Sequence, residues 1–480
     1  MSKKSSHEAN GLKLNVKRTA FIGFAFFGIL LLWQIYDSWC PTFLTDIFAR
    51  RMFNMSSAEL KTSNPDNILK VQWLVGIIMS CDNLAALILL PIFGNLSDKT
   101  KSPIGKRMPY ILTGTFVAAI AFPFIPLFFH YNNIVGMVIS MAIVLMFMMM
   151  YRNPAVSLMP DITPKPLRAK ANGIINIMGY FGGASATVLG IFLKLSDYIN
   201  AADEARKLMT IEIPFIIASI LMIISALVLF FKINELKLEE ELHDELALGE
   251  KLAAVENPID DDKPMSKGNK RMLFAILAAE FLWFMSDNAI GTYIGNYVIY
   301  YLHSSSSNTM FLIIIGGVAS VVGFATAGAI ADKIGRKWTI SIGLGITVVA
   351  LVLMCQVKGV EMLTTEGYAP FPVLLFVVWA IKGFGMALVH NCSFPMVVEL
   401  CSSKKIGKFT GFYYTASMSA QTVTPILLGF IFTRTGVWSA LPIYSTILVI
   451  LSFVVFTSLV KNIKAVKVEN VKGLEAIGDD

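Results

Sequence analysis

Twelve long apolar stretches constrain the fold of this chain more than any other feature. Each has about 20 residues or more, the length with which an α-helix crosses the hydrocarbon core of a bilayer. They lie at 19–45, 70–96, 109–129, 134–158, 171–194, 210–232, 271–301, 309–331, 338–357, 371–398, 409–432 and 438–460. The sequence therefore predicts an all-α membrane protein with twelve transmembrane helices, six on either side of a charged central segment.

The composition supports a membrane protein and argues against several other classes. Of the 480 residues, 55% are hydrophobic and only 15% are charged, which is far more apolar than a soluble protein of this length. The net charge of +7 comes from short basic loops, which suit anionic lipid and not a nucleic-acid surface. The chain has no C-x-x-C, H-E-x-x-H or G-x-S-x-G motif, so we predict no metal, no cofactor and no enzymatic activity.

Lysine and arginine placement predicts the orientation in the membrane. The links 99–107, 161–170, 333–337 and 404–408 are basic, whereas 130–133 and 302–308 have no lysine or arginine. Because cytoplasmic loops carry the excess of basic residues, we expect both termini and the central segment to be cytoplasmic. The first apolar stretch lacks a small-residue cleavage site and is predicted to be a retained helix. A monomer in the cell membrane is the expected form.

The domain organisation follows from the spans. We predict a cytoplasmic tail over 1–18, an N-terminal six-helix bundle over 19–232, a linker over 233–270, a C-terminal bundle over 271–460 and a second tail over 461–480. Leucines 236, 238, 242 and 246 recur among glutamates, as in an amphipathic helix on the cytoplasmic surface. Residues 258–264 have the composition of a flexible tether.

The two halves repeat in sequence. Trp33 and Asp37 in the first span match Trp283 and Asp287 in the seventh at equal spacing. The segment that begins Arg152-Asn153 in the fourth span aligns without gaps on His390-Asn391 in the tenth. Two such matches in corresponding spans indicate two pseudo-symmetric six-helix bundles related by an axis along the membrane normal.

A tight loop identifies a family resemblance. The loop from Gly94 to Ile111 has the pattern G-x-x-x-D-[KR]-x(n)-G-[KR]-[KR], and a shorter copy recurs from Gly328 to Lys337. This pattern resembles the signature loop of the major facilitator superfamily. The fuller loop is similar to that of sucrose–proton symporters, and the segment 154–160 resembles glycoside–pentoside–hexuronide cation symporters. The resemblance covers the chain apart from its tails and linker, and it implies transport by alternating access.

Ionisable side chains inside the spans are the candidate functional residues. Each costs at least ~2.5–3.5 kcal/mol to insert and therefore needs a partner or a water-accessible chamber. These residues are Asp37, Asp82, Arg152, Glu280, Asp287, Lys382 and His390. An Asp37–Arg152 ion pair is a structural alternative to a role for both in a cavity. For Lys382 we expect a carboxylate partner, either Asp287 or Glu280.

We predict a central substrate site made of aromatic, amide and charged side chains, because aromatic rings stack on sugars and polar groups bind hydroxyls. Its members are Trp33, Gln34, Asp37, Asn83, Arg152, Asn153, Trp283, Asp287, Asn288, His390, Asn391 and Gln421. The candidates for the proton-coupling acid are Asp37, Asp287 and Glu280, in that order.

Charged residues at the cytoplasmic ends of the spans form a predicted gate. We expect salt bridges between helices there while the carrier faces outward, and their loss when it opens inward. The gate residues are Asp98, Arg107, Asp161, Arg168, Asp332, Arg336, Glu399 and Lys408. The resemblance implies this role for Asp98 and Asp332.

The predicted function is proton-coupled symport of a disaccharide or other glycoside such as sucrose or maltose. Melibiose-type sodium carriers have paired aspartates where this chain has Ala86 and Leu90, so the resemblance favours protons over sodium. The acid of plant sucrose carriers in the fourth span falls near Leu145 here, which leaves the proton site open. Sodium-coupled uptake, export of drugs or metabolites, and a membrane sugar sensor are the alternatives.

Overall fold

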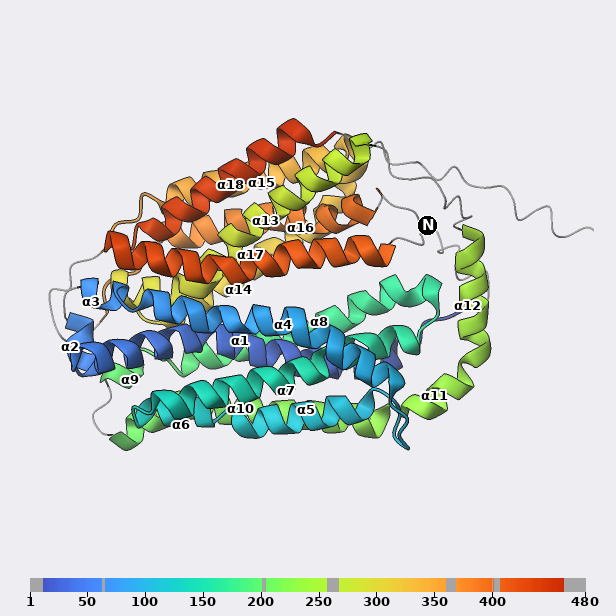
Figure 1. Cartoon of the computed structure of the whole chain (residues 1–480), viewed down its shortest axis with the longest axis horizontal. Coiled ribbons are helices and arrows are strands. Elements are labelled where there is room, and N and C mark those ends of the chain that lie inside the picture. Colours follow the sequence, from blue (N-terminus) through green and yellow to red (C-terminus); the bar gives the residue numbers. More distant parts are fainter. Residues whose placement is uncertain are drawn as a thin grey trace, which may run out of the picture.

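A computed structural model describes residues 12–62, 65–200, 204–256, 267–359, 368–398, 400 and 406–461. Twelve of its helices are long and apolar enough to cross a membrane, as the apolar stretches predicted. They run roughly along one direction in two groups, which the colours of Figure 1 separate by sequence half. All-helical structure follows from burial in lipid, where each backbone N–H and C=O must be satisfied within its own helix.

The N-terminal half contains six spans and several short connecting helices. The spans are α1 (Val16–Phe53), α4 (Gln72–Lys99), α5 (Met108–Ala121) continued by α6 (Phe124–His130), α7 (Ile134–Asp161), α8 (Arg168–Phe192) and α10 (Glu204–Lys232). The short helices are α2 (Ser57–Thr62), α3 (Pro65–Leu69), η2 (Lys165–Leu167) and α9 (Asp197–Asn200). The third span is interrupted between α5 and α6, where Pro123 lacks the N–H that a continuous helix needs.

The C-terminal half repeats this arrangement. Its spans are α13 (Lys267–Asn296) continued by the π-helix η3 (Tyr297–Tyr301), α14 (Ser307–Ile334), α15 (Arg336–Met354), α16 (Leu374–Val398), α17 (Ile406–Thr435) and α18 (Ala440–Leu459). The predicted pseudo-symmetric pair of six-helix bundles is therefore the observed architecture.

The linker forms two helices, α11 (Glu235–Glu241) and α12 (His243–Glu256), which lie across one end of the bundle (Figure 1). We call this the linker end and the opposite end the far end. Leu242 is buried and Gly249 packs closely on Pro164, whereas Leu236 is exposed. The predicted amphipathic helix thus docks on the ends of the N-terminal helices through part of its apolar face. The predicted tether at 258–264 lies outside the described residues.

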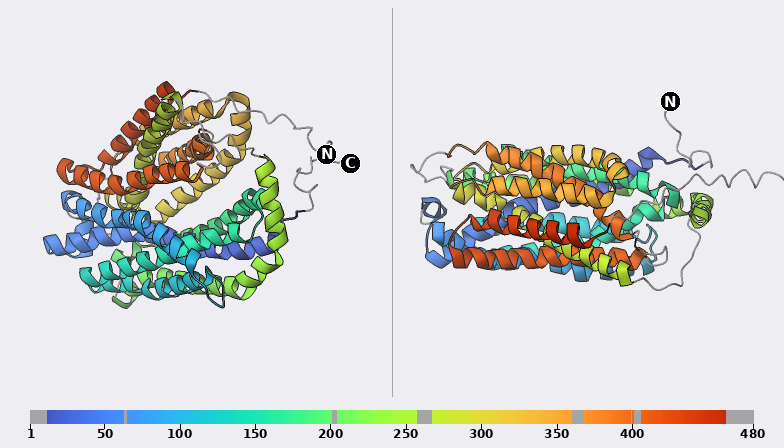
Figure 2. Two further views of the ribbon diagram at one scale, coloured as in Figure 1. Left: turned by 45° about the vertical axis from the view of Figure 1, so that its right-hand side comes forward. Right: turned by 90° about the horizontal axis from the view of Figure 1, so that it is seen from above.

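The two halves meet at the far end and diverge toward α12 (Figure 2). Trp73 of α4 stacks on Phe430 of α17 with ring centroids 5.9 Å apart. Close approach of these helices requires Gly76, because a Cβ there would lie 2.1 Å from the carbonyl oxygen of Pro425. Small residues at such crossings let membrane helices pack backbone to backbone.

Candidate functional site

Charged residues from α1, α4 and α7 converge in the N-terminal half. Asp37 lies in the middle of α1 and is exposed, although its helix is packed by neighbours along most of its length. The charges of Asp37, Asp82 and Arg152 interact with one another. Among the described residues, Arg152 forms no ion pair with either acid, so the alternative of a direct Asp37–Arg152 salt bridge is not what the structure shows.

Asp82 on α4 is buried and bonded locally. Its Oδ1 accepts hydrogen bonds from the backbone N–H of Asn83 at 2.5 Å and from Nδ2 of Asn83 at 2.8 Å. The Asn83 amide is thereby occupied by its neighbour. Asp37 differs because it is exposed, and it is the acid of this cluster that is open to a solute.

Aromatic and amide groups surround Asp37 on α1. Trp33, one turn before it, packs edge-on against Tyr36 with ring centroids 5.8 Å apart. Trp33 Nε1 and the Tyr36 hydroxyl are both buried without a hydrogen-bond partner. Gln34 donates from Nε2 to the hydroxyl of Ser38 at 3.0 Å. An exposed carboxylate with a half-buried indole ring one turn before it on the helix is suited to a hydroxylated solute.

A second charged cluster lies in the C-terminal half, on α13 and α16. The Lys382 amine contacts the carboxylate of Asp287, which confirms the expected partnership of this lysine with an intramembrane acid. His390, on the same helix as Lys382, interacts with the charges of both. The His390 ring packs on Phe284 with centroids 5.2 Å apart. The matching positions of the two sequence repeats thus form one charged cluster in each half.

Tyr414 of α17 adds a group from the C-terminal half to the N-terminal cluster and is absent from the sequence-based set. It is exposed, and it interacts electrostatically with Arg152 of the opposite half. The Thr415–Thr424 stripe of hydroxyls on the same helix was a signal that could have pointed to it. Because α4 and α17 pack directly on each other, groups on α17 face the N-terminal cluster.

Glu280 is placed differently from the other candidate acids. It has no exposed surface, and neither carboxylate oxygen has a hydrogen-bond partner. Trp283, one turn later, is also fully buried, packs on Phe456 of α18 and has an unpartnered Nε1. The structure therefore brings Asp287 to a partly exposed position but keeps Glu280 and Trp283 inside the C-terminal half.

The amide candidates have diverse surroundings. Asn153 donates to the carbonyl oxygen of Leu90 at 2.7 Å and so connects α7 to α4. Gln421 donates to the Ser417 carbonyl oxygen at 3.3 Å, and Asn391 is exposed. Asn288 has a buried Oδ1 without a partner, beside Asp287. Of this group, Asn288 and Asn391 have the most capacity left for a solute.

The far end is closed by hydrogen bonds between the halves. Asn296 of α13 is fully buried and donates to Thr45 Oγ1 at 2.8 Å, while Thr42 Oγ1 donates to Asn296 Oδ1 at 2.9 Å. Gln72 of α4 lies 3.5 Å from the Asn296 amide and also donates to Thr45. This group of four polar residues, the Asn296 cluster, keeps its hydrogen bonds to Asn296 only while the halves touch.

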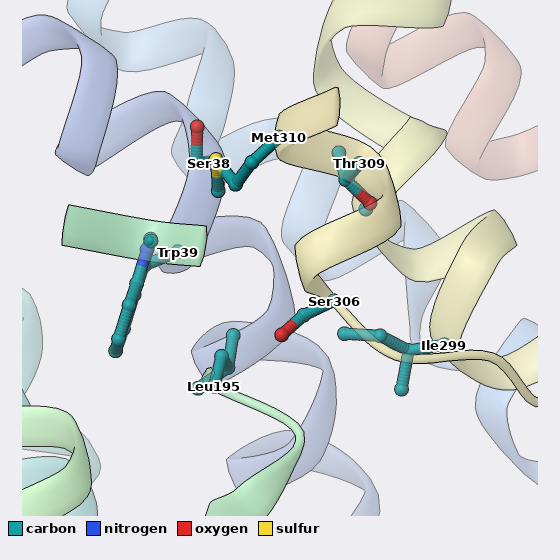
Figure 3. A pocket seen from close by; sticks show the side chains of 9 residues that line it. Ser38, Trp39, Leu195, Ile299, Ser306, Thr309 and Met310 are labelled. Carbon is teal, nitrogen blue, oxygen red and sulfur yellow. The ribbon is translucent and has the colours of Figure 1, made fainter. Parts of the chain in front are cut away.

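A serine contact closes the same end beside the Asn296 cluster. Ser196 and Ser306 pair through their hydroxyls at 3.2 Å, and each backbone N–H donates to the other hydroxyl at 3.2 Å. A neighbouring cavity, with about 10 Å³ of room for a water-sized molecule, is lined by Ser38, Ser306 and Thr309 among others (Figure 3). This space is about that of one water molecule, so the cavity is too small for a larger solute.

Three of the predicted gate residues form an ion-pair network within the N-terminal half. Arg107, in the loop before α5, contacts Asp98 at the end of α4 and donates from Nε to Asp161 at 2.9 Å. Lys106 adds a contact to Asp161 at 3.4 Å. Burial alone would lower the pKa of Arg107, but the hydrogen bonds and charges of Asp161 and Asp98 outweigh it and hold the pKa above its ordinary value.

This network is intact while the halves diverge at the same end, so for Arg107 the expectation that divergence breaks the gate bridges is wrong. The physical reason is that all three partners belong to the N-terminal half and move with it. Arg168 donates to the carbonyl oxygens of Pro160 and Thr163 at the end of α7. Asp332 is exposed, Arg336 is half-buried and Lys408 lies over the Phe412 ring, whereas Glu399 lies outside the described residues.

Comparison with known proteins gives the family. The chain matches the family model of the Major Facilitator Superfamily over residues 19–279 and 272–476. No match is found among curated proteins.

Solved structures of transporters share the fold. The POT family transporter PepTSo has 12% identity and a TM-score of 0.66, over 93% of this chain and 98% of that one. The inward open xylose transporter XylE from E. coli has 15% identity and a TM-score of 0.62, over 93% and 96%. A bacterial homologue of the iron transporter ferroportin in an inward-facing state has 12% identity and a TM-score of 0.63, over 93% of this chain and 99% of that one.

Proposed function

We propose that this chain, which belongs to the major facilitator superfamily, is a proton-coupled symporter of a disaccharide or similar glycoside. The observation that carries the proposal is the exposed carboxylate of Asp37 in the middle of a membrane-spanning helix, with the half-buried ring of Trp33 one turn before it. A carboxylate accepts hydrogen bonds from sugar hydroxyls, while an indole ring stacks on the apolar face of a sugar.

Alternating access supplies the mechanism. The halves are bonded at the far end and diverge at the linker end (Figure 2). With the termini cytoplasmic, as the basic loops predict, this is an inward-facing arrangement in a multi-pass protein of the cell membrane. Rocking of the halves would break the Asn296 cluster and expose the two charged clusters to the other side.

The substrate contacts proposed for the two halves are complementary. Asp37, Trp33 and Arg152 of the N-terminal half would bind one sugar, and Tyr414 with the Asp287–Lys382 pair would bind the other. Both clusters carry donors and acceptors, which suits a neutral polyhydroxylated solute better than an apolar drug. This balance of polar groups favours uptake of a glycoside over export of a drug.

Counterflow in proteoliposomes against a panel of mono- and disaccharides tests the proposal. Exchange of a disaccharide, with uphill uptake driven by an imposed pH gradient in sodium-free buffer, is the expected result. A sodium requirement would favour the sodium-coupled alternative, and binding without accumulation would favour a sensor.

The variant Asp37→Asn tests the role of Asp37 in the same assay. If Asp37 is the coupling acid, the variant keeps exchange and loses uphill uptake. If Asp37 is a substrate contact only, exchange is lost too. Asp244→Asn, on exposed α12, is the matched control.

A further inference from the structure

Glu280 on α13 is an acid that the substrate site does not use. Its side chain has no exposed surface, and neither of its oxygens has a hydrogen-bond partner among the residues that the structure describes. The other candidate acids within the spans have other surroundings, since Asp287 contacts Lys382, Asp82 accepts from Asn83 and Asp37 is exposed. An ionised carboxylate without solvent, cation or donor is strongly disfavoured, so Glu280 holds a proton in this arrangement.

The groups that face Glu280 are aromatic or neutral. Tyr413 of α17 interacts with it electrostatically, and the Tyr413 hydroxyl is shared with Ser393 of α16 at 2.9 Å. On α18, which packs along α13, Ser452 donates to the Ala279 carbonyl oxygen, and the helix contains no acidic or basic residue. From α16, Lys382 and His390 interact with Asp287. No basic side chain forms an ion pair with Glu280 in the described part of the chain.

Two aromatic rings connect the surroundings of Glu280 to the charged cluster at Asp287. Phe284 packs on His390 of that cluster, and it also meets the Tyr413 ring edge-on with centroids 6.5 Å apart. Tyr413 in turn packs on Phe394 of α16. Because Glu280 and Asp287 are seven residues apart, they lie on one face of α13. Glu280 is the acid nearer to the linker end, and it is the one that interacts with Tyr413.

We propose that the coupling proton is carried on Glu280, at a fully buried position beside Tyr413 that is separate from the substrate-binding clusters. The proposal rests on the proposed proton-coupled transport and identifies its proton site. The step forms one O–H bond on a carboxylate oxygen when a proton enters from the far side, and breaks it when the proton leaves to solvent at the linker end. Displacement of the Tyr413 ring gives that solvent access, so proton release depends on the arrangement of α16 and α17.

Infrared spectroscopy of the whole purified protein tests the proton site without any substrate. A protonated carboxylic acid has a carbonyl stretching band that an ionised carboxylate lacks. We expect this band in the wild type at neutral pH, its loss in Glu280→Gln and its retention in Glu212→Gln, a half-buried glutamate of α10. A band that survives Glu280→Gln unchanged would overturn the assignment.

Transport by the same variants tests the coupling. We expect Glu280→Gln to retain counterflow and to lose uphill uptake driven by a pH gradient; uphill uptake that survives would overturn the proposal. If Glu280→Gln does not fold, Glu280→Met, with a neutral and unbranched side chain, is tested in its place. The same results are expected: counterflow is retained and uphill uptake is lost. Failure of every sugar in wild-type counterflow would contradict the proposed function alone, because the infrared band still reports the proton on Glu280.

Discussion

Lys382 on α16 and Asp287 on α13 form an ion pair between two helices of the C-terminal half, with 14% and 37% of their side chains exposed. Either charge alone within a membrane span would cost free energy, and each compensates the charge of the other. Asp287 is accessible enough to meet a solute, while Lys382 is covered. The pair therefore couples the packing of two helices to the state of the proposed substrate site.

A double-mutant cycle on this pair should show strong coupling. Lys382→Met leaves the Asp287 carboxylate without its cation, so we expect a loss of about 2 kcal/mol in unfolding free energy. Asp287→Asn in the same chain should recover part of that loss, which gives a coupling energy of about 1–3 kcal/mol. Thermal unfolding in detergent measures the cycle, and additive single effects would show that the pair contributes nothing.

Asn296 should control closure of the far end. Asn296→Ala removes the partner of the Thr42 hydroxyl and of the Gln72 side-chain oxygen. Each buried group left without a partner costs about 1–3 kcal/mol. Only the closed arrangement bears this cost, so the population open at the far end should rise about tenfold.

Accessibility of a cysteine introduced at Ser38, beside the cavity of Figure 3, measures that population. The exposed native Cys81 is first replaced by Ser. Thr422→Ala is the control, because the Thr422 hydroxyl bonds only within its own helix, to the Met418 carbonyl oxygen. Equal alkylation of the Asn296 variant and the control would contradict the role of the Asn296 cluster.

The contact between Glu235 and the loop before α5 should anchor the linker. The Glu235 carboxylate accepts hydrogen bonds from the backbone N–H groups of Lys106, Arg107 and Met108 at 3.0–3.2 Å. An acid at a helix N-terminus satisfies free N–H groups and the helix dipole. We expect Glu235→Gln to cost about 1 kcal/mol and to speed proteolysis within 242–266. Glu240→Gln, on the exposed side of α11, should change neither.

Gly105 should not accept a side chain at the same contact. Its φ of +106° is unfavourable for other residues, and a Cβ would lie 2.2 Å from Oε2 of Glu235. Gly105→Ala should therefore lower the melting temperature and release α11, with faster cleavage of the linker as the measurement. A variant as stable and as resistant as the wild type would contradict the close contact.

Arg107→Lys should weaken the junction of α4, α5 and α7. The guanidinium forms ion pairs with Asp98 and Asp161 and donates a hydrogen bond to the Ser97 hydroxyl at the same time. A lysine ammonium lacks the planar fork of donors that makes these contacts. We expect a loss of about 1–2 kcal/mol in stability. Because the network stays within one half, the open population at the far end should stay unchanged, and a change in cysteine accessibility would show that it acts between the halves.

The sequence by itself determined the membrane fold, because length and hydrophobicity are local properties and a bilayer accepts little besides helices of that length. It also identified Lys382 as needing an acid and Asp37 as a costly mid-span charge. Tertiary packing decided the rest. It selected Asp287 over Glu280 as the lysine's partner, placed Tyr414 opposite Arg152, buried Trp283 and kept the Arg107 network inside one half. These outcomes depend on which helix faces meet across the bundle, and contacts between distant segments leave no periodic trace in the sequence.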